Sequence, residues 1–358
     1  MLNAVKPSMA RYNNKHHAGQ PGLHRIYVVE MERKPAQYIY ILTASLVYCL
    51  IVVLGVGLYR ISEVPMLSKT QQPILIEYKK NTSATQLVHA LQKQQLLDNG
   101  SLLLALIRYQ GVSHQLHAGI YQILPGETPL QFIHKVTLGD VLKQKITIVE
   151  GTTQRQVIEQ LKHAPYLSYA KDDWTVIPSG HESDEGLLLA DTYQYEAGSS
   201  SRALIRQANL ALTEVLNQAW AHRDPNVPYK SPYELLVAAS ILEKETSSAD
   251  ERKIISGVIM NRINKHMRLQ VDPTVIYALG EQYSGKLTRK GLKIDSPYNT
   301  YKYRGLPPTP IAMVSRSSIY AAANPEHHQY IYFVAKGDGT HEFSRTYEEQ
   351  KQAIKKYL

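Results

Sequence analysis

The feature that most constrains this chain is an uninterrupted run of 22 uncharged residues from Tyr38 to Tyr59. A helix rises about 1.5 Å per residue, so a run of this length can cross the roughly 30 Å hydrocarbon core of a bilayer. The run starts far from Met1 and lacks a small-residue cleavage signature, which argues against a removable signal peptide. We expect a transmembrane helix over residues 38–59, with a buried core helix as the alternative.

The net charge of +9 is divided unevenly along the chain. Residues 1–60 hold seven Lys/Arg and two Asp/Glu, whereas the remainder holds 33 and 29. Close to the membrane the basic residues are balanced on the two sides. Long downstream domains cross largely regardless of charge, so the short basic tail decides and favours a cytoplasmic N-terminus. No concentrated basic stripe indicates nucleic-acid binding.

The cysteine and histidine residues of the chain limit which metal sites are possible. The single cysteine, Cys49, lies inside the hydrophobic run, so no disulfide framework or CxxC metal site can form within one chain. The fourteen histidines contain no HExxH pattern, and the adjacent His327 and His328 are poorly spaced as two ligands on one helix face. We expect no metal site and no cofactor.

Three segments after the hydrophobic run share a strand–turn–helix pattern. Each opens with alternating apolar residues, which is typical of a strand. A residue that tolerates positive φ follows, and then a Ser or Thr suited to a helix N-cap. These turn and cap residues are Asn81 and Ser83, Gly126 and Thr128, and Gly151 and Thr153. The middle unit, with its Gly-Glu-Thr turn, resembles the LysM glycan-binding module, which implies wall attachment; a scaffold subdomain that touches no sugar is the alternative.

The segment SPYELLVAASILEKET predicts a well-bounded helix. Ser231 can cap it, a proline suits its first position, and Glu234 completes a capping box. A second box, Ser248 and Glu251, starts another helix, so the first helix spans about Pro232 to Thr246.

The helical periodicity of this segment separates its two terminal glutamates. One apolar stripe comprises Leu235, Ala238, Ile241 and Leu242. Ser240 and Lys244 fall on the opposite side, while Glu245 lies about 60° and Glu243 about 100° from the centre of the stripe. A carboxyl group near an apolar stripe loses water, which raises its pKa and keeps a proton available for a glycosidic oxygen. The alternative is a frayed last turn with both glutamates in water.

From about residue 146 to its end, the chain resembles the endolytic murein transglycosylase family, also called YceG-like. The matching stretches, in the family's order, are ASILEKET (Ala239–Thr246), VIMNRI (Val258–Ile263), MRLQVDPTVIYALG (Met267–Gly280), SPYNTYKYRGLPPTPI (Ser296–Ile311) and YIYFVAKGDGTHEFS (Tyr330–Ser344). The strand–helix units and the hydrophobic run fit the family as well. Ala190 stands where family members usually carry proline, which puts only the local loop shape in doubt.

The resemblance implies a set of site residues. The catalytic glutamate falls in the EKET motif, with Glu245 as first choice and Glu243 as second. The residues implied in substrate binding are Gln270, Asp272, Tyr298, Asn299 and Tyr301. Asp272 is also the obvious second carboxylate of a hydrolase, but we interpret it as capping or ordering the turn before Pro273.

The resemblance also implies an α+β architecture and a cellular role. The expected parts are a cytoplasmic tail (1–37), a transmembrane helix (38–59), a linker (60–72), a small LysM-like domain (73–145) and a mixed α/β catalytic domain (146–358). The implied enzyme sits in the bacterial inner membrane with its catalytic domain in the periplasm. It cleaves the MurNAc–GlcNAc β-1,4 bond of nascent peptidoglycan strands, leaves 1,6-anhydro-MurNAc ends, terminates strand elongation and works alongside peptidoglycan synthases. A lysozyme-type hydrolase and a non-catalytic wall-binding scaffold are the alternatives.

Overall fold

The computed structural model describes residues 35–178, 180–246 and 248–357. The chain divides into two units, Met1–Gly57 and Leu58–Leu358. Most of the expected cytoplasmic tail, residues 1–34, lies outside the described residues. The first helix, α1, spans Pro35–Glu63, and its segment Tyr38–Glu63 is long and apolar enough to cross a membrane. The expected helix is therefore present, and it continues beyond Tyr59 into the first residues of the expected linker.

The residues after α1 build a first hydrophobic core. Its elements are β1 (Ile74–Tyr78), α2 (Ala84–Lys93), α3 (Ser101–Tyr109), the 3-10 turn η1 (Val112–His114), β2 (Gly119–Ile123) and α4 (Pro129–Leu138). The two strands pair antiparallel, with Ile76 opposite Tyr121. Leu87 and Leu91 of α2 and Phe132 of α4 are buried in the same core, so both helices present one apolar face to it.

Three strand–turn–helix units form where the sequence predicts them. The third joins β3 (Lys143–Thr147) to α5 (Gln154–His163). In each unit the cap hydroxyl accepts from the third helical N–H, and the glutamine there accepts from the cap N–H; the caps are Ser83, Thr128 and Thr153. The turn residues adopt positive φ, at 65° for Asn81, 88° for Gly126 and 76° for Gly151. The predicted turn and cap chemistry is confirmed in all three.

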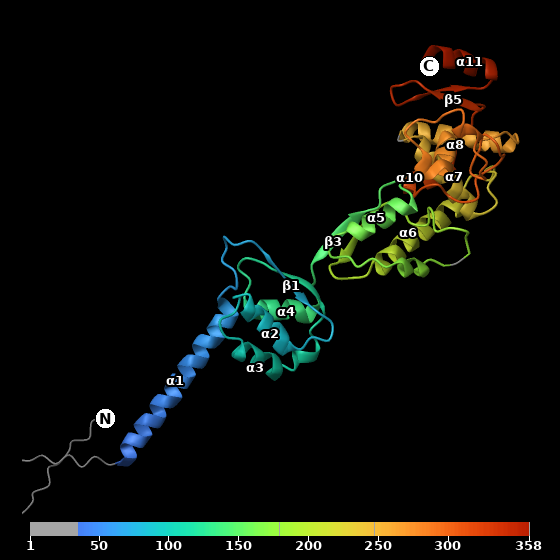
Figure 1. Cartoon of the computed structure of the whole chain (residues 1–358). Coiled ribbons are helices and arrows are strands. Elements are labelled where there is room, and N and C mark those ends of the chain that lie inside the picture. Colours follow the sequence, from blue (N-terminus) through green and yellow to red (C-terminus); the bar gives the residue numbers. More distant parts are fainter. Residues whose placement is uncertain (1–34, 179, 247, 358) are drawn as a thin grey trace, which may run out of the picture. The chain divides into compact units, whose positions relative to one another are not determined.

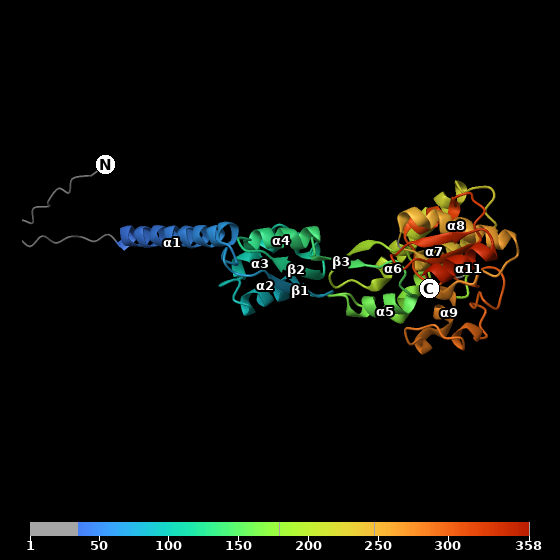
Figure 2. The same ribbon diagram turned by 90° about the horizontal axis from the view of Figure 1, so that it is seen from above.

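The rest of the chain builds a second, larger core. Its remaining elements are η2 (Lys171–Val176), β4 (Thr192–Glu196), α6 (Ser201–Ala221), α7 (Pro232–Glu245), α8 (Ala249–Asn264), α9 (Asp272–Leu279), η3 (Gly280–Gln282), η4 (Gly291–Lys293), α10 (Arg316–Ala323), β5 (Tyr332–Ala335), β6 (His341–Ser344) and α11 (Tyr347–Tyr357). β3 pairs antiparallel with β4, and β5 with β6. Figure 1 shows α7 among α6, α8 and α10, and Figure 2 shows α11 beside the β5–β6 hairpin. The mixed α/β class is confirmed.

Helix α7 is buried on every side rather than along one stripe. All eight residues from Leu235 to Leu242 are buried. Ser240, predicted on the polar side, has no exposed surface: its hydroxyl donates to the Val237 carbonyl at 2.7 Å and accepts from the Ile311 N–H at 3.0 Å. The predicted stripe was therefore too narrow, because neighbouring helices and the segment around residue 311 surround α7.

The helices α7 and α8 begin where predicted, but their capping boxes are only half formed. Ser231 accepts from the N–H of Glu234 at 3.2 Å, whereas the Glu234 carboxylate accepts from the N–H one residue before the cap. Ser248 likewise accepts from the N–H of Glu251 at 3.4 Å. The Glu251 carboxylate instead bonds the backbone N–H and the ring Nδ1 of His341, each at 2.8 Å. In α8, the distant residue His341 therefore takes the place that the N–H of the cap residue would have in a complete capping box.

The contact of α8 with the segment before β5 requires a glycine. A Cβ at Gly257 would lie 2.3 Å from the carbonyl oxygen of Glu326 and 2.6 Å from Nε2 of His328. That imidazole nitrogen is itself fixed, 2.7 Å from the carbonyl oxygen of Ile254. A side chain at position 257 would therefore push α8 away from this segment.

We predict that Gly257→Ala lowers the stability of the protein by about 1–3 kcal/mol, because overpacking outweighs the gain in helix propensity. Thermal unfolding of the full-length protein in detergent measures the effect. Lys253→Ala, at an exposed position of the same helix, is the control and should leave the melting temperature nearly unchanged. An increase in stability for Gly257→Ala would contradict the close contact.

Candidate active site

The two acids at the end of α7 lie in different surroundings. The side chain of Glu243 is only 3% exposed. Its Oε2 accepts from the N–H of Ser315 at 2.7 Å and from the Ser315 hydroxyl at 2.6 Å, and its Oε1 lies 3.8 Å from the Arg252 guanidinium. Because Ser315 is the N-cap of α10, Glu243 fastens the start of α10 to the end of α7. Its Oε2 is engaged in this structural contact, and its side chain is almost fully buried.

Glu245 is the freer of the two acids. It is the last residue of α7 and is partly buried. Within residues 35–178, 180–246 and 248–357, no hydrogen bond or ion pair engages its carboxyl group. The expectation that the Glu245 carboxyl group loses water agrees with its raised pKa, for which burial is the main cause. The helical angle did not predict that Ser315, the N-cap of α10, bonds the Glu243 carboxylate.

The carboxyl group of Glu245 is set up to hold a proton. Burial raises its pKa, the nearby charge of Asp272 raises it further, and the Arg262 guanidinium lowers it, with a resulting pKa of about 7. A carboxyl group with a pKa near neutrality is protonated for a substantial fraction of the time and can act as a general acid and then as a general base.

Asp272, whose charge raises the pKa of Glu245, lies in the first turn of α9. Its Oδ1 accepts a hydrogen bond from the Tyr301 hydroxyl at 2.5 Å. Burial and this bond to the carboxylate both raise the pKa of Tyr301, so the phenol remains a donor. Asp272 does not cap α9: its N-cap is Val271, and Thr274 bonds the Val271 carbonyl. The capping role expected for Asp272 was therefore wrong, and its carboxylate is instead held by Tyr301.

The segment before α9 is fastened to the loop that carries Tyr301. Gln270 has a φ of 53°, in the left-handed region that is strained for residues other than glycine. Its N–H donates to the Thr300 carbonyl at 3.1 Å, and the next N–H, that of Val271, donates to the Thr300 hydroxyl at 3.0 Å. The Gln270 side chain is exposed. These bonds bring Gln270, Asp272 and Tyr301 into one region beside Glu245.

Arg262 of α8, which the sequence analysis did not single out, lies on the same side. Its guanidinium donates to the carbonyl oxygens of Ile331 and Leu269, each at 2.6 Å. The signal available in the sequence is an arginine inside the mainly apolar stretch VIMNRI, because an arginine that is buried there needs partners for its guanidinium.

The other two expected substrate residues lie elsewhere. Asn299 has no exposed surface; its amide donates to the carbonyls of Leu292 and Ile294, and its oxygen accepts from the Tyr301 N–H. Asn299 thus shapes the loop and has no face free for a sugar, which corrects the expectation for it. Tyr298 packs against Tyr277 with ring centres 4.9 Å apart.

Comparison with known proteins identifies the family. Residues 76–356 match the YceG-like family. The chain belongs to the YceG-like family.

Named relatives of this YceG-like protein agree on one activity. An endolytic murein transglycosylase of Bacillus subtilis (strain 168) is 29% identical over 322 residues, covering 82% of this chain and 87% of the relative. One from Streptococcus pneumoniae serotype 2 is 25% identical over 313 residues, covering 76% of this chain and 56% of the relative. A crystal structure of a YceG-like protein from Listeria monocytogenes shares 29% identity, covers 78% of this chain and 98% of its own, and gives a TM-score of 0.48.

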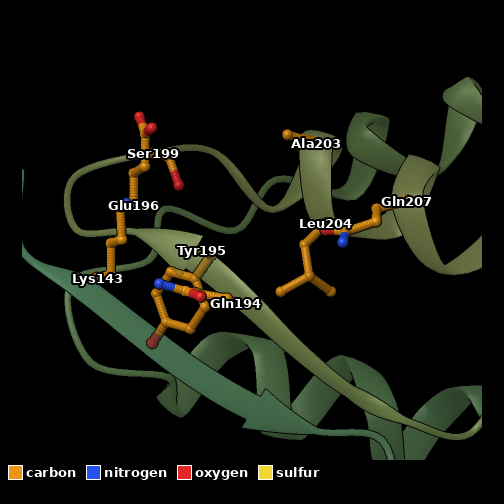
Figure 3. A pocket seen from close by; sticks show the side chains of 8 residues that line it. All are labelled: Lys143, Gln194, Tyr195, Glu196, Ser199, Ala203, Leu204 and Gln207. Carbon is orange, nitrogen blue, oxygen red and sulfur yellow. The ribbon is translucent and has the colours of Figure 1, made fainter. Parts of the chain in front are cut away.

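The YceG-like protein also has a pocket away from these acids. Its volume is about 490 Å³, and Figure 3 shows that the paired strands β3 and β4 and the start of α6 line it. Tyr195 forms a buried part of its wall, and its hydroxyl donates to the Pro165 carbonyl. Lys143 and Glu196 are opposite one another in the register of the two strands, and both are exposed. Neither acid of α7 lines this pocket, so it is not the candidate active site.

Opposite effects on stability should separate the two acids. We predict that Glu243→Gln destabilises the protein by about 2–4 kcal/mol, because it weakens charge-assisted bonds to Ser315 and leaves the Arg252 charge unpaired. The pKa of Glu245 is raised to about 7 in the folded protein, so the folded protein holds this proton more tightly than the unfolded chain does. The protonated Glu245 therefore adds to the free energy of unfolding below pH 4.5, and this gain is lost as the pH rises to about 7. Glu245→Gln should therefore gain stability relative to wild type over that window, on the order of 2–3 kcal/mol.

Thermal unfolding of both variants and wild type, at intervals from pH 4.5 to 7.5, measures this difference. If Glu243→Gln were as stable as wild type, or if Glu245→Gln showed no pH-dependent gain, the two environments would be assigned incorrectly.

Proposed function

We propose that this protein is an endolytic peptidoglycan lytic transglycosylase, which cleaves the MurNAc–GlcNAc β-1,4 bond and forms 1,6-anhydro-MurNAc ends. The observation that carries the proposal is the Glu245 carboxyl group, partly buried, free of hydrogen bonds within the described residues, and with its pKa raised to about 7. The carboxylate of its neighbour Glu243 is bonded to Ser315, lies near the Arg252 guanidinium and is almost fully buried.

Membership of the YceG-like family supports the class of reaction. The chain is an enzyme of the lytic transglycosylase class, as its relatives named endolytic murein transglycosylase are. The type of bond, the product and the position of the cut on the strand belong to the proposal.

In the first step, protonated Glu245 donates its proton to the glycosidic oxygen between MurNAc and GlcNAc. The bond from this oxygen to C1 of MurNAc breaks, and GlcNAc leaves with a free hydroxyl group. The MurNAc ring then carries positive charge shared between C1 and the ring oxygen. The Asp272 carboxylate, oriented by Tyr301, places a negative charge near Glu245, which favours the protonated acid before the step.

In the second step, the carboxylate of Glu245 takes the proton from the C6 hydroxyl of the same MurNAc. The C6 oxygen attacks C1 and closes the 1,6-anhydro ring, so Glu245 regains its proton and no water is consumed. One carboxyl group therefore serves as acid and then as base, which requires a pKa near the working pH.

Substrate contacts are proposed for the exposed and partly exposed groups beside Glu245. The exposed amide of Gln270 can donate to a sugar hydroxyl, and Asp272 can accept from one with its second oxygen. The partly exposed ring of Tyr301 offers an apolar face for a pyranose. For Tyr298 the proposed contact is more peripheral, because its hydroxyl is already within 2.8 Å of the Thr309 hydroxyl.

The cellular setting follows from the apolar helix and the basic tail. We propose that α1 is a single-pass anchor in the inner membrane, with residues 1–37 in the cytoplasm and the catalytic part in the periplasm. Residues 73–145 would form a LysM-like domain that holds glycan strands near the membrane, and the catalytic domain would follow from 146. Cleavage there would terminate strands that peptidoglycan synthases elongate.

A lysozyme-type hydrolase is the second candidate, favoured by Asp272. This carboxylate lies close enough to Glu245 to raise its pKa, as a second acid of a hydrolase would. In a hydrolase, water would attack C1 and the product would carry a reducing end.

We predict that Glu245→Gln lowers cleavage of purified sacculi on the order of 10²–10⁴-fold, because the amide cannot transfer a proton. Mass spectrometry of the wild-type digest should show anhydro ends; reducing ends alone would favour the hydrolase. Glu214→Gln, an exposed acid on α6, is the matched control and should cleave at the wild-type rate. Retained cleavage by Glu245→Gln would remove the basis of the proposed mechanism.

A further inference from the structure

The position of the Glu245 carboxyl group depends on the backbone that carries it. In the part of the chain that the structure describes, no hydrogen bond or ion pair holds this carboxyl group. Glu245 is the last residue of α7, and helix ends fray because their final carbonyl groups lack partners within the helix. The bond from the Thr246 N–H to the Leu242 carbonyl, which closes the helix, is long at 3.4 Å. The last turn of α7 therefore needs support from other elements.

Side chains tie down the two residues before Glu245. The Glu243 carboxylate is bonded to Ser315, the N-cap of α10. Lys244 donates from Nζ to the carbonyl oxygen of Gly151 at 3.0 Å, which connects the same turn of α7 to the segment between β3 and α5. These contacts hold the last turn of the helix on the side that precedes Glu245.

Arg252 of α8 holds the residue that follows Glu245. Its Nη2 donates to the Thr246 carbonyl oxygen at 3.3 Å. The backbone of Thr246 is extended, with a φ of −147°, so the chain leaves the helix here and this carbonyl group lies outside the helical bonding pattern. A guanidinium at this place supplies the missing donor and interacts favourably with the negative end of the helix dipole.

The same guanidinium belongs to a closed network with Glu243. Nη1 of Arg252 donates to the Ser317 hydroxyl at 2.5 Å, and this hydroxyl lies 2.8 Å from the Ser315 hydroxyl. Because Ser315 gives its single hydroxyl hydrogen to the Glu243 carboxylate, Ser317 is the donor between the two serines. Nη2 of Arg252 lies 3.8 Å from Oε1 of Glu243 and closes the ring. Two opposite charges and two hydroxyl groups are thus connected in one direction.

This network is largely shielded from water. The side chains of Glu243 and Arg252 are 3% and 11% exposed. Buried charge-assisted bonds are stronger than exposed ones and are screened less by salt. The Arg252 guanidinium is therefore held in one place, and the Thr246 carbonyl that it bonds is held with it.

We propose that Arg252 is a positioning residue for Glu245: by bonding the Thr246 carbonyl, its guanidinium holds the backbone that orients the Glu245 carboxyl group. The inference rests on the proposed function, in which Glu245 passes a proton to a glycosidic oxygen. Proton transfer requires the acid within hydrogen-bond reach of that oxygen, and a misplacement of about 1 Å can lower the rate about 10²-fold. Glu243 and Ser317 contribute by keeping the guanidinium in place.

The test compares variants of the full-length protein in detergent, with glycan strands from purified sacculi as substrate. Arg252→Gln removes the charge and the planar set of donors, and Arg252→Lys retains the charge alone. Lys253→Gln removes an exposed charge at the next position of α8 and is the matched control. The kcat and KM of each variant are measured well below its melting temperature and at the maximum of its pH profile. Neither unfolding nor a shifted pKa of Glu245 can then be mistaken for lost alignment.

For Arg252→Gln we expect kcat to fall by about 10–100-fold while KM stays within about twofold, because alignment of the acid acts on the transition state. Arg252→Lys should recover only part of kcat, since an ammonium cannot reproduce the planar fork of bonds. Lys253→Gln should match wild type. In a Glu243→Gln background, Arg252→Gln should cost less in kcat than it does alone, because both residues act through one network.

Hydrogen–deuterium exchange of the backbone amides gives a second readout that does not depend on catalysis. We expect faster exchange at the end of α7 in Arg252→Gln, because its last turn opens more often. The buried centre of the helix, Leu235–Leu242, should keep its wild-type protection. A general loss of stability would instead speed exchange along the whole helix.

Two outcomes would overturn the inference. One is a folded Arg252→Gln with the wild-type kcat, and the other is a loss of kcat without faster exchange at the end of α7. If Arg252→Gln and Arg252→Lys both unfold, Ser317→Ala decides, because it removes an exposed partner of the guanidinium. Wild-type kcat and exchange in that variant would also overturn the inference. The proposed function fails separately, if Glu245→Gln still cleaves glycan.

Discussion

The complete enclosure of α7 is the constraint on which the site depends. Eight consecutive buried residues, Leu235–Leu242, fix this helix against α6, α8, α9 and α10, so its last turn has little freedom to move. Two residues apart on a helix means about 200° of rotation, so Glu243 and Glu245 must meet different neighbours. α10 covers the first and ties it to Ser315, while the second stays partly open. A fixed helix end thus places two similar acids in different surroundings.

The surroundings of Glu245 explain how one carboxyl group can serve twice. Burial alone would favour the protonated form and leave a poor base. Asp272 acts in the same direction as burial, and Arg262 acts against both. The balance leaves the pKa near neutrality, where the loss and the recovery of a proton are both accessible. The backbone bonds of Arg262 and the Tyr301 contact of Asp272 hold these two charged groups in place.

Local chemistry was predictable from the sequence, and tertiary partners were not. The caps at Ser83, Thr128 and Thr153, the positive-φ turns and the starts of α7 and α8 all depend on residues within a few positions of each other. The errors have one cause. The Glu251 carboxylate bonds a residue 90 positions away, and Glu243 bonds one 72 positions away. The helical periodicity of one segment cannot predict which distant residues its side chains will bond.

The proposed choice of Glu245 over Glu243 rests, in the structure, on a different reason from the angular one. Angular distance from an apolar stripe cannot rank two acids on a helix that is buried all round, since every direction from it is covered. What separates them is the supply of donors: Glu243 meets an N–H, a hydroxyl and a guanidinium, whereas Glu245 meets a carboxylate and an arginine that is bound elsewhere. In such a helix the carboxyl group that neighbouring elements leave without hydrogen bonds is the one available for proton transfer, and its pKa is then set by charges it does not touch.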